Sequence, residues 1–181
     1  MTPVFGVTGW KNSGKTTLVE RLISELTDRG YRIATIKHAH HMFDIDKEGT
    51  DSYRHRQAGA HEVALVSGFR WALMHEVGNE GEPTLETMTA HMSPADLIII
   101  EGYKSEPHLK IEVRRKAARK NQALADRDDS IVAIAADHDI SNTDLPVFDL
   151  NDVKAIAGFL IEKIDLGAPK QNGSDHGKET S

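Results

Sequence analysis

The sequence predicts an α/β fold in which helices flank a mostly parallel sheet, with one antiparallel strand pair. Short apolar runs alternate along the chain with stretches whose apolar residues recur at helical spacing. An apolar run, such a stretch and a second run follow one another within residues 3–37, and a strand–helix–strand unit of this length implies a parallel sheet. The 181 residues, 39% hydrophobic and 28% charged, are enough to bury an ordinary core.

The first three elements fit this unit. Residues 3–8 are short, apolar and β-rich, as buried strands are. Residues 15–29 place apolar side chains on one helical face and charged side chains opposite, and Gly30 follows as a C-cap. Residues 31–37 predict the second strand.

Residues 38–76 predict a loop, a short helix and two strand-like runs. Residues 38–49 lack periodicity and indicate a loop, and residues 51–58 predict a short helix that Gly59 ends. Residues 61–67 and 69–76 are both strand-like and a single glycine separates them. They form either a hairpin or two separate strands of the main sheet.

The remaining elements complete the sheet and its cover. Residues 83–91 predict a helix, and residues 96–101 are the clearest central strand, with four apolar residues between two acids. Further strands are predicted over 109–113 and 131–136, and an amphipathic helix over 151–164.

Composition and charge exclude several classes of protein. The chain has no cysteine, which excludes disulfides, thiolate zinc sites, cysteine-ligated iron–sulfur clusters and a cysteine nucleophile. A net charge of −6 gives no support for non-specific binding to nucleic acid or an anionic membrane. With no signal-peptide pattern and no bilayer-spanning run, we expect a cytoplasmic protein with one domain over residues 1–165 and a disordered polar tail over 166–181.

The segment GWKNSGKT at residues 9–16 matches the pattern G-x-x-x-x-G-K-[ST] at every fixed position. Glycines let successive amides of such a loop face a phosphate, and the following helix adds the positive end of its dipole. We expect Lys15 to bridge β- and γ-phosphate oxygens and Thr16 to ligate Mg²⁺. A chance turn is the alternative, but the flanking strand and helix favour nucleotide binding. The predicted phosphate-binding residues here are Gly9, Lys11, Asn12, Ser13, Gly14, Lys15 and Thr16.

A magnesium site at this loop needs an acidic partner, and the strand over residues 96–101 offers two. Glu101 lies at the carboxyl end, where ligands gather in open parallel sheets, whereas Asp96 lies at the opposite end. Glu101 is therefore the predicted Mg²⁺ ligand, directly or through water. A solvated acid at the strand end is the alternative.

The loop after the second strand is rich in histidine and aspartate. Asp44 and Asp46 could reach Mg²⁺ or its waters, since oxygen ligands suit that ion. Two alternatives stay open: a transition-metal site built from His38, His40 and His41, and a solvated loop without a chemical role.

Basic residues gather in and after the strand at 109–113. They fit a solvated helix face, a site for a second anion, or a mobile arginine lid over a transferred phosphoryl group. These residues are Lys110, Arg114, Arg115, Lys116, Arg119 and Lys120.

Together these motifs resemble the MobB family, the GTP-binding adapters of molybdopterin-guanine dinucleotide biosynthesis. Many families share the phosphate loop. The specific signals are His-His-x-x-Asp-x-Asp at 40–46, Gly-x-Asp-Ser-Tyr at 49–53 and Glu-Gly-Tyr-Lys at 101–104. The resemblance covers residues 3–164 and implies a P-loop NTPase-like fold, a homodimer, GTP with Mg²⁺, and weak GTPase activity at most. It also implies a partner, the nucleotidyltransferase MobA, which joins GMP to molybdopterin.

The resemblance also assigns roles by matching position. The expected phosphate and Mg²⁺ residues are Gly14, Lys15, Thr16 and Thr17, and the expected metal-side acids are Asp46 and Glu101. Lys37 is expected to face phosphate at its strand end, whereas His40 and His41 belong to the motif without an assigned role. No Asn-Lys-x-Asp box is present, so Asp137, after the strand at 131–136, is the expected guanine reader by position.

Two other functions stay open beside the adapter. A small-molecule or nucleotide kinase would use the same loop, and a metallochaperone GTPase would use the histidines at 38–41. The adapter is favoured because the sequence shows no obvious general base for a kinase acceptor, and no glutamine follows Glu101 to orient an attacking water. For a dimeric adapter we expect the strand pair at 61–76 to form the interface. Molybdopterin is a further possible ligand, and the basic stretch is its candidate site.

Overall fold

The computed structural model describes residues 2–39, 43–118 and 122–169. The chain divides into two compact units, which we describe separately: Met1–His38 with Thr89–Ser181, and Ala39–Met88. No linker in the sequence marks this division, and the predicted boundary at residue 165 stays a prediction. The predicted tail falls largely outside the described residues. Among the described helices, none is long and apolar enough to cross a membrane.

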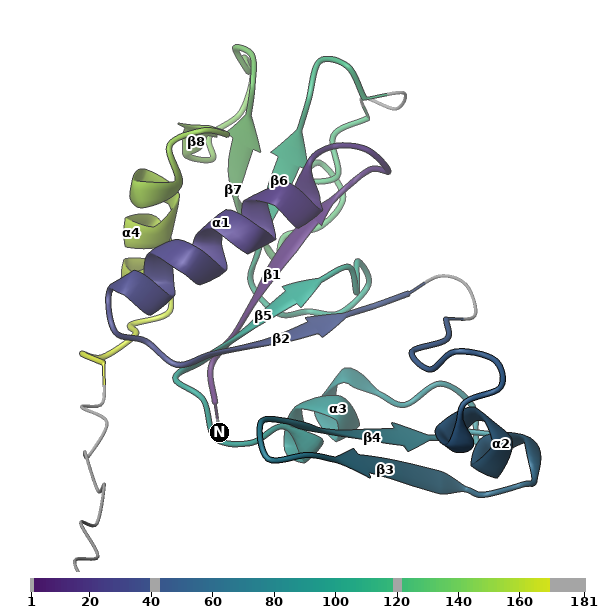
Figure 1. Cartoon of the computed structure of the whole chain (residues 1–181). Helices are drawn as coiled ribbons and strands as arrows, with labels where there is room; N and C mark the ends of the chain where they lie inside the picture. The colour runs from purple at the N-terminus through teal and green to yellow at the C-terminus, as the bar shows by residue number, and fades with distance from the viewer. Residues whose placement is uncertain (1, 40–42, 119–121, 170–181) are drawn as a thin grey trace, which may run out of the picture. The chain divides into compact units, whose positions relative to one another are not determined.

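The first unit is built on a six-stranded sheet of order β2-β5-β1-β6-β7-β8, in which every neighbouring pair is parallel (Figure 1). Its strands are β1 (Val4–Gly9), β2 (Ile33–Lys37), β5 (Leu97–Glu101), β6 (Lys110–Arg114), β7 (Ile131–Ala136) and β8 (Val147–Asp149). The predicted α/β class and five of these strands are confirmed. The parallel arrangement places the carboxyl ends of all six strands along one edge of the sheet.

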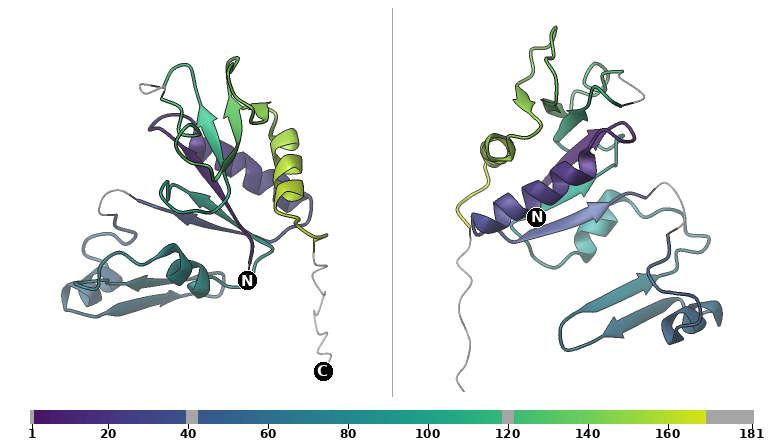
Figure 2. Two further views of the ribbon diagram at one scale, coloured as in Figure 1. Left: turned by 180° about the vertical axis from the view of Figure 1, so that it is seen from behind. Right: turned by 45° about the horizontal axis from the view of Figure 1, so that its top comes forward.

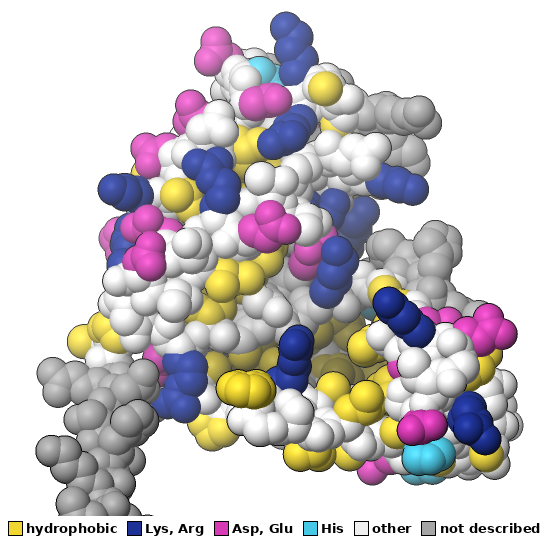
Figure 3. Space-filling model, viewed as in Figure 1, with side chains coloured by type: hydrophobic (Ala, Val, Ile, Leu, Met, Phe, Trp, Pro, Cys, Tyr) yellow, Lys and Arg dark blue, Asp and Glu magenta, His cyan; other side chains and the backbone are white. Residues whose placement is uncertain are grey.

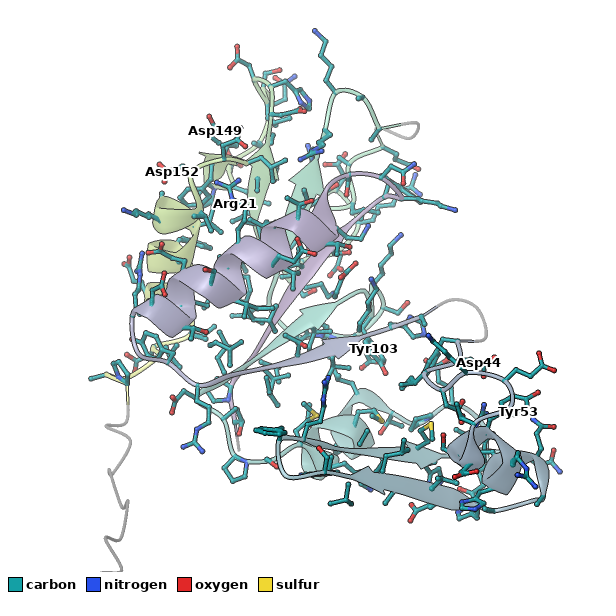
Figure 4. The ribbon with its side chains drawn as sticks, in the orientation of Figure 1. Arg21, Asp44, Tyr53, Tyr103, Asp149 and Asp152 are labelled. Atoms are coloured by element: carbon teal, nitrogen blue, oxygen red, sulfur yellow. The ribbon has the colours of Figure 1, made fainter. Side chains whose placement is uncertain are left out.

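Helices α1 (Lys15–Asp28) and α4 (Val153–Lys163) cover one face of this sheet, and Figure 2 shows them on the same side from two further directions. Alternate residues of β1 and β6 point into the core beneath them, packed against the apolar face of α1. Arg21 joins the two helices, because its Nη2 donates to the carbonyl oxygen of Asn151 at 2.6 Å, and Asp152 caps α4 by accepting from the amide of Ala155 at 3.1 Å (Figure 4).

The other face of β1 and β6 carries buried polar groups. Lys110 is fully buried, and its Nζ donates to Asp128 Oδ2 at 2.8 Å, to Ser130 Oγ at 2.6 Å and to the carbonyl oxygen of Lys104 at 3.1 Å. The interpretation of the basic stretch as a solvated helix face is therefore wrong for Lys110. This residue lies in a strand, and its buried ammonium pairs with the partly exposed carboxylate of Asp128.

The second unit contains α2 (Asp51–Gln57) and a two-stranded antiparallel sheet of β3 (Glu62–Val66) and β4 (Trp71–His75). The register pairs Val66 with Trp71, so the hairpin alternative is confirmed and the separate-strand alternative is wrong. Helix α3 (Leu85–His91) begins in this unit and ends in the first. Large apolar side chains of the hairpin are exposed, among them Val66 at 80%, Phe69 at 101% and Trp71 at 67%.

Candidate functional site

The phosphate loop joins β1 to α1 at the carboxyl edge of the sheet. Gly9 and Gly14 both adopt positive φ, of 148° and 94°. A Cβ built on Gly9 would lie 2.6 Å from the carbonyl oxygen of Val113, which leaves no room for a side chain. The sequence pattern is thus explained by the fold, because the tight curl needs glycine at these two positions.

Lys15 folds back onto its own loop. Its Nζ donates to the carbonyl oxygen of Trp10 at 2.8 Å. Burial lowers the pKa of Lys15, nearby Lys104 lowers it further, Glu101 raises it, and Lys37 lowers it again. Positive charge therefore accumulates around a half-buried amine at a helix N-terminus, an arrangement that favours an anionic ligand.

Thr16 and Glu101, the two expected Mg²⁺ ligands at the phosphate loop, lie together. Thr16 Oγ1 donates to Glu101 Oε1 at 2.8 Å, and Lys37 Nζ lies 3.6 Å from Glu101 Oε2. The sheet explains this meeting, because β2 and β1 flank β5 and the register pairs both Lys37 and Val7 with Glu101. A hydroxyl and a carboxylate are oxygen ligands of the kind that Mg²⁺ uses beside phosphate oxygens and water. The donor set therefore fits Mg²⁺.

Asp46, the other predicted metal-side acid, lies in the second unit and forms an ion pair with Arg56. Arg56 donates to Asp46 through Nη2 at 2.7 Å and Nε at 3.2 Å, and also to Asp44 at 3.1 Å and Glu76 at 3.0 Å. The hydrogen bonds from Arg56 hold the pKa of Asp46 below its usual value. The guanidinium also lies 5.6 Å from the ring centre of Tyr53, labelled with Asp44 in Figure 4. The metal role of Asp46 stays a prediction.

The histidines of the loop are only partly described. His38 stacks on Tyr103, with ring centres 4.7 Å apart, and its amide donates to the carbonyl oxygen of Glu101 at 2.9 Å. His40 and His41 lie outside the described residues. Within the described ranges, no group of three or more histidine, aspartate or glutamate side chains is placed to hold a metal ion. The transition-metal alternative therefore gains no support from His38.

Trp10 connects the phosphate loop to segments that are distant in sequence. Its Nε1 donates to the carbonyl oxygen of Gln122 at 2.7 Å, and Lys104 Nζ lies 4.5 Å from its ring centre. Sequence reasoning missed this contact, since nothing in the spacing relates Lys104 to Trp10. A tryptophan inside the loop makes nucleotide binding observable by fluorescence.

Asp137, the predicted guanine reader, holds two neighbouring groups. Its Oδ1 accepts from the amide of Lys116 at 2.8 Å and lies 2.9 Å from Nδ1 of His138. The contact with His138, followed by the Lys116 amide, lowers the pKa of Asp137. Asp137 thus fastens the turn after β6 to the end of β7, and its role in reading guanine stays a prediction.

Charge on the face that Figure 3 shows is mixed. Figure 3 shows Lys and Arg side chains interspersed with Asp and Glu on the side that carries α1. This pattern agrees with the acidic net charge of −6 and with a local, rather than extended, cationic site.

Comparison with known proteins gives consistent matches. The family model described as "Molybdopterin guanine dinucleotide synthesis protein B" matches residues 4–137. The molybdopterin-guanine dinucleotide biosynthesis adapter protein of Escherichia coli (strain K12) is 41% identical and covers 96% of this chain and 97% of its own length. The Haemophilus influenzae protein of the same name is 37% identical, with 87% of each chain covered.

Solved structures agree with the fold. A crystal structure of molybdopterin-guanine biosynthesis protein B has a TM-score of 0.70 and 25% identity, and covers 90% of this chain and 99% of that chain. A MobB homologue from Bacillus stearothermophilus has a TM-score of 0.68 and 26% identity, with 90% and 97% covered.

Proposed function

This chain belongs to the MobB family, and from that premise we propose that it is a cytoplasmic GTP-binding adapter of molybdopterin-guanine dinucleotide biosynthesis, which assists the nucleotidyltransferase MobA. The observation that carries the proposal is the phosphate loop with Thr16 and Glu101 joined at 2.8 Å beside Lys15. The near-full-length match to proteins named as adapters supports the pathway.

The chain's own residues account for nucleotide binding. Backbone amides of the loop would cradle the phosphates of a bound nucleotide, and Lys15 would exchange the carbonyl oxygen of Trp10 for β- and γ-phosphate oxygens. Thr16 and Glu101 would hold Mg²⁺, directly or through water, and Lys37 would add positive charge beside them. Bound Mg²⁺ supplies charge neutralisation at the β- and γ-phosphates.

Turnover is expected to be slow. Fast hydrolysis needs a residue that orients the attacking water, and Glu101 is followed by Gly102, Tyr103 and Lys104. Tyr103 stacks on His38 at the carboxyl end of β5 (Figure 4). The site therefore suits a protein that holds GTP and presents its bound state to a partner.

The proposal includes a homodimer formed through the hairpin of β3 and β4. Its strands have open edges, and Val66, Phe69 and Trp71 expose apolar surface that monomers seldom leave to water. A second copy of the same hairpin offers matching edges and apolar side chains. Trp71→Glu should shift the chain to monomer in sedimentation equilibrium, whereas Val147→Glu, at an exposed valine of β8, should leave its mass unchanged. An unchanged mass in Trp71→Glu would contradict this interface.

Nucleotide titration tests the proposal. The Trp71→Phe background leaves Trp10 as the remaining tryptophan of the two in the chain, so its fluorescence reports the loop. We expect GTP analogues with Mg²⁺ to bind well above ATP analogues, binding to disappear in Lys15→Ala, and the loaded protein to associate with MobA. A preference for ATP with rapid phosphoryl transfer to an acceptor would favour the kinase instead. Stoichiometric Zn²⁺ or Ni²⁺ binding, lost in His40→Ala and His41→Ala, would favour the metallochaperone.

A further inference from the structure

Arg115, immediately after β6, lies against the phosphate loop. A Cβ built on Gly14 would lie 2.7 Å from Arg115 Nε, 2.9 Å from Cζ and 3.2 Å from Nη2. The guanidinium therefore packs on the α-carbon of Gly14, the N-cap residue of α1. The absence of a side chain at Gly14 makes this approach possible, in addition to permitting its φ of 94°.

Arg115 lacks a negative partner among the residues that the structure describes. Helix α1 has no acidic residue in its first turn and no side-chain N-cap, and Lys15 follows Gly14 directly. Among the described residues, Arg115 forms no ion pair, whereas the adjacent Arg114 pairs with Glu112 at 2.6 Å. A half-buried guanidinium next to the positive end of a helix dipole is unfavourable unless an anion joins them.

The backbone holds Arg115 in this position. The amide of Ala118 donates to the carbonyl oxygen of Arg115 at 3.0 Å, and the amide of Lys116 donates to Asp137 Oδ1 at 2.8 Å. These bonds fix the backbone of the turn that carries Arg115, and the contact with Gly14 places the guanidinium at the loop before a ligand arrives. A donor that is pre-positioned in this way loses little freedom on binding.

We propose that Arg115 is a nucleotide-binding residue whose guanidinium contacts the α- and β-phosphates on the Gly14 side of the loop. This inference rests on the proposed nucleotide binding. Loop amides of this motif cradle the α- and β-phosphates, whereas its lysine reaches the β- and γ-phosphates. Arg115 packs on the glycine that supplies such an amide, so its contribution is common to GDP and GTP. Arginine suits this role because its planar fork matches two phosphate oxygens.

The test compares GDP and GTP affinity, measured by titration calorimetry, in Arg115→Ala, Arg115→Lys and a matched control. Loss of a charge-assisted contact should weaken both nucleotides by about 10- to 100-fold in Arg115→Ala, with a smaller loss in Arg115→Lys, which keeps charge but not the fork. Lys116→Ala removes the same charge from an exposed neighbour and should change neither affinity by more than about twofold.

Two results would overturn the inference: unchanged affinities in Arg115→Ala, or a loss confined to GTP, which would place the guanidinium at the γ-phosphate. Thermal melting checks folding, and if Arg115→Ala melts early, Arg115→Lys decides between the same outcomes. Failure of the proposed function is separate, because then the wild-type chain would bind neither nucleotide, or would bind independently of Lys15.

Discussion

Replacing Lys110 with methionine tests whether the buried amine stabilises the fold. Lys110→Met keeps the volume of the side chain but removes three hydrogen bonds from a fully buried Nζ, one of them to the carboxylate of Asp128. All three hydrogen bonds have a charged donor, and each is worth about 1.5–3 kcal/mol. Relief of the desolvated ammonium offsets part of that sum, so we expect a net loss of about 3 kcal/mol.

Urea unfolding followed by far-ultraviolet circular dichroism measures this loss, and the melting temperature should fall by about 6–12 °C in a domain of this size. Asp128→Asn combined with Lys110→Met completes a double-mutant cycle, which should give a coupling of at least about 1 kcal/mol. The exposed Lys116→Met is the control and should remain within about 0.5 kcal/mol of wild type. A Lys110→Met variant as stable as wild type would refute the reasoning, because the amine would then contribute no net stabilisation.

Three further predictions follow. In calorimetry, Glu101→Gln should weaken GTP binding about tenfold or more when Mg²⁺ is present, but should not weaken it in EDTA. Glu20→Gln, on the exposed face of α1, is the control, and an equal loss of affinity in both buffers would contradict a metal role for Glu101. Asp46→Asn should speed amide hydrogen exchange in α2 more than Asp44→Asn does, because Asp46 accepts two hydrogen bonds from Arg56 and Asp44 accepts one. Equal exchange rates in the two variants would contradict this order. Burial, with Lys110 nearby, lowers the pKa of His108 to about 4, so as the pH falls the unfolded chain takes up this proton before the folded chain does. The free energy of unfolding should therefore fall by about 1–2 kcal/mol between pH 6.5 and pH 4, after allowance for partial exposure of the ring. His108→Gln should lose that much less stability across the same pH range.

The sequence predicted those parts of the fold that depend on local pattern. The run at residues 131–136 matches β7 residue for residue, because its apolar side chains are confined between turns. The phosphate loop and its two flanking elements were predicted for the same reason. Strand β8 was missed, since Val147–Asp149 has three residues, two of them exposed, and carries no periodic signal.

Long-range polar pairing could not be predicted. The sequence places Lys110 in a basic stretch that is typical of a surface. In the structure this side chain is buried and donates to Asp128, which lies 18 residues further along the chain. The same limit applied to Arg56, which binds Asp46 from a different element. In the candidate site, Thr16 and Glu101 could be assigned to one edge of the sheet, because the phosphate loop follows one parallel strand and Glu101 ends another. Arg115 over Gly14 could not, since loop conformation decides where that guanidinium lies.

The second compact unit occupies the connection between β2 and β5, and these two strands are neighbours in the sheet. A folding chain must therefore close a long connection before β2 can pair with the strand that carries Glu101. The entropy of that closure grows with the number of flexible residues in the connection, and early formation of α2 and the local hairpin would reduce that number. We therefore expect the inserted unit to form before this edge of the sheet, and Glu101, the expected metal-side acid, to reach its place beside Lys37 late in folding.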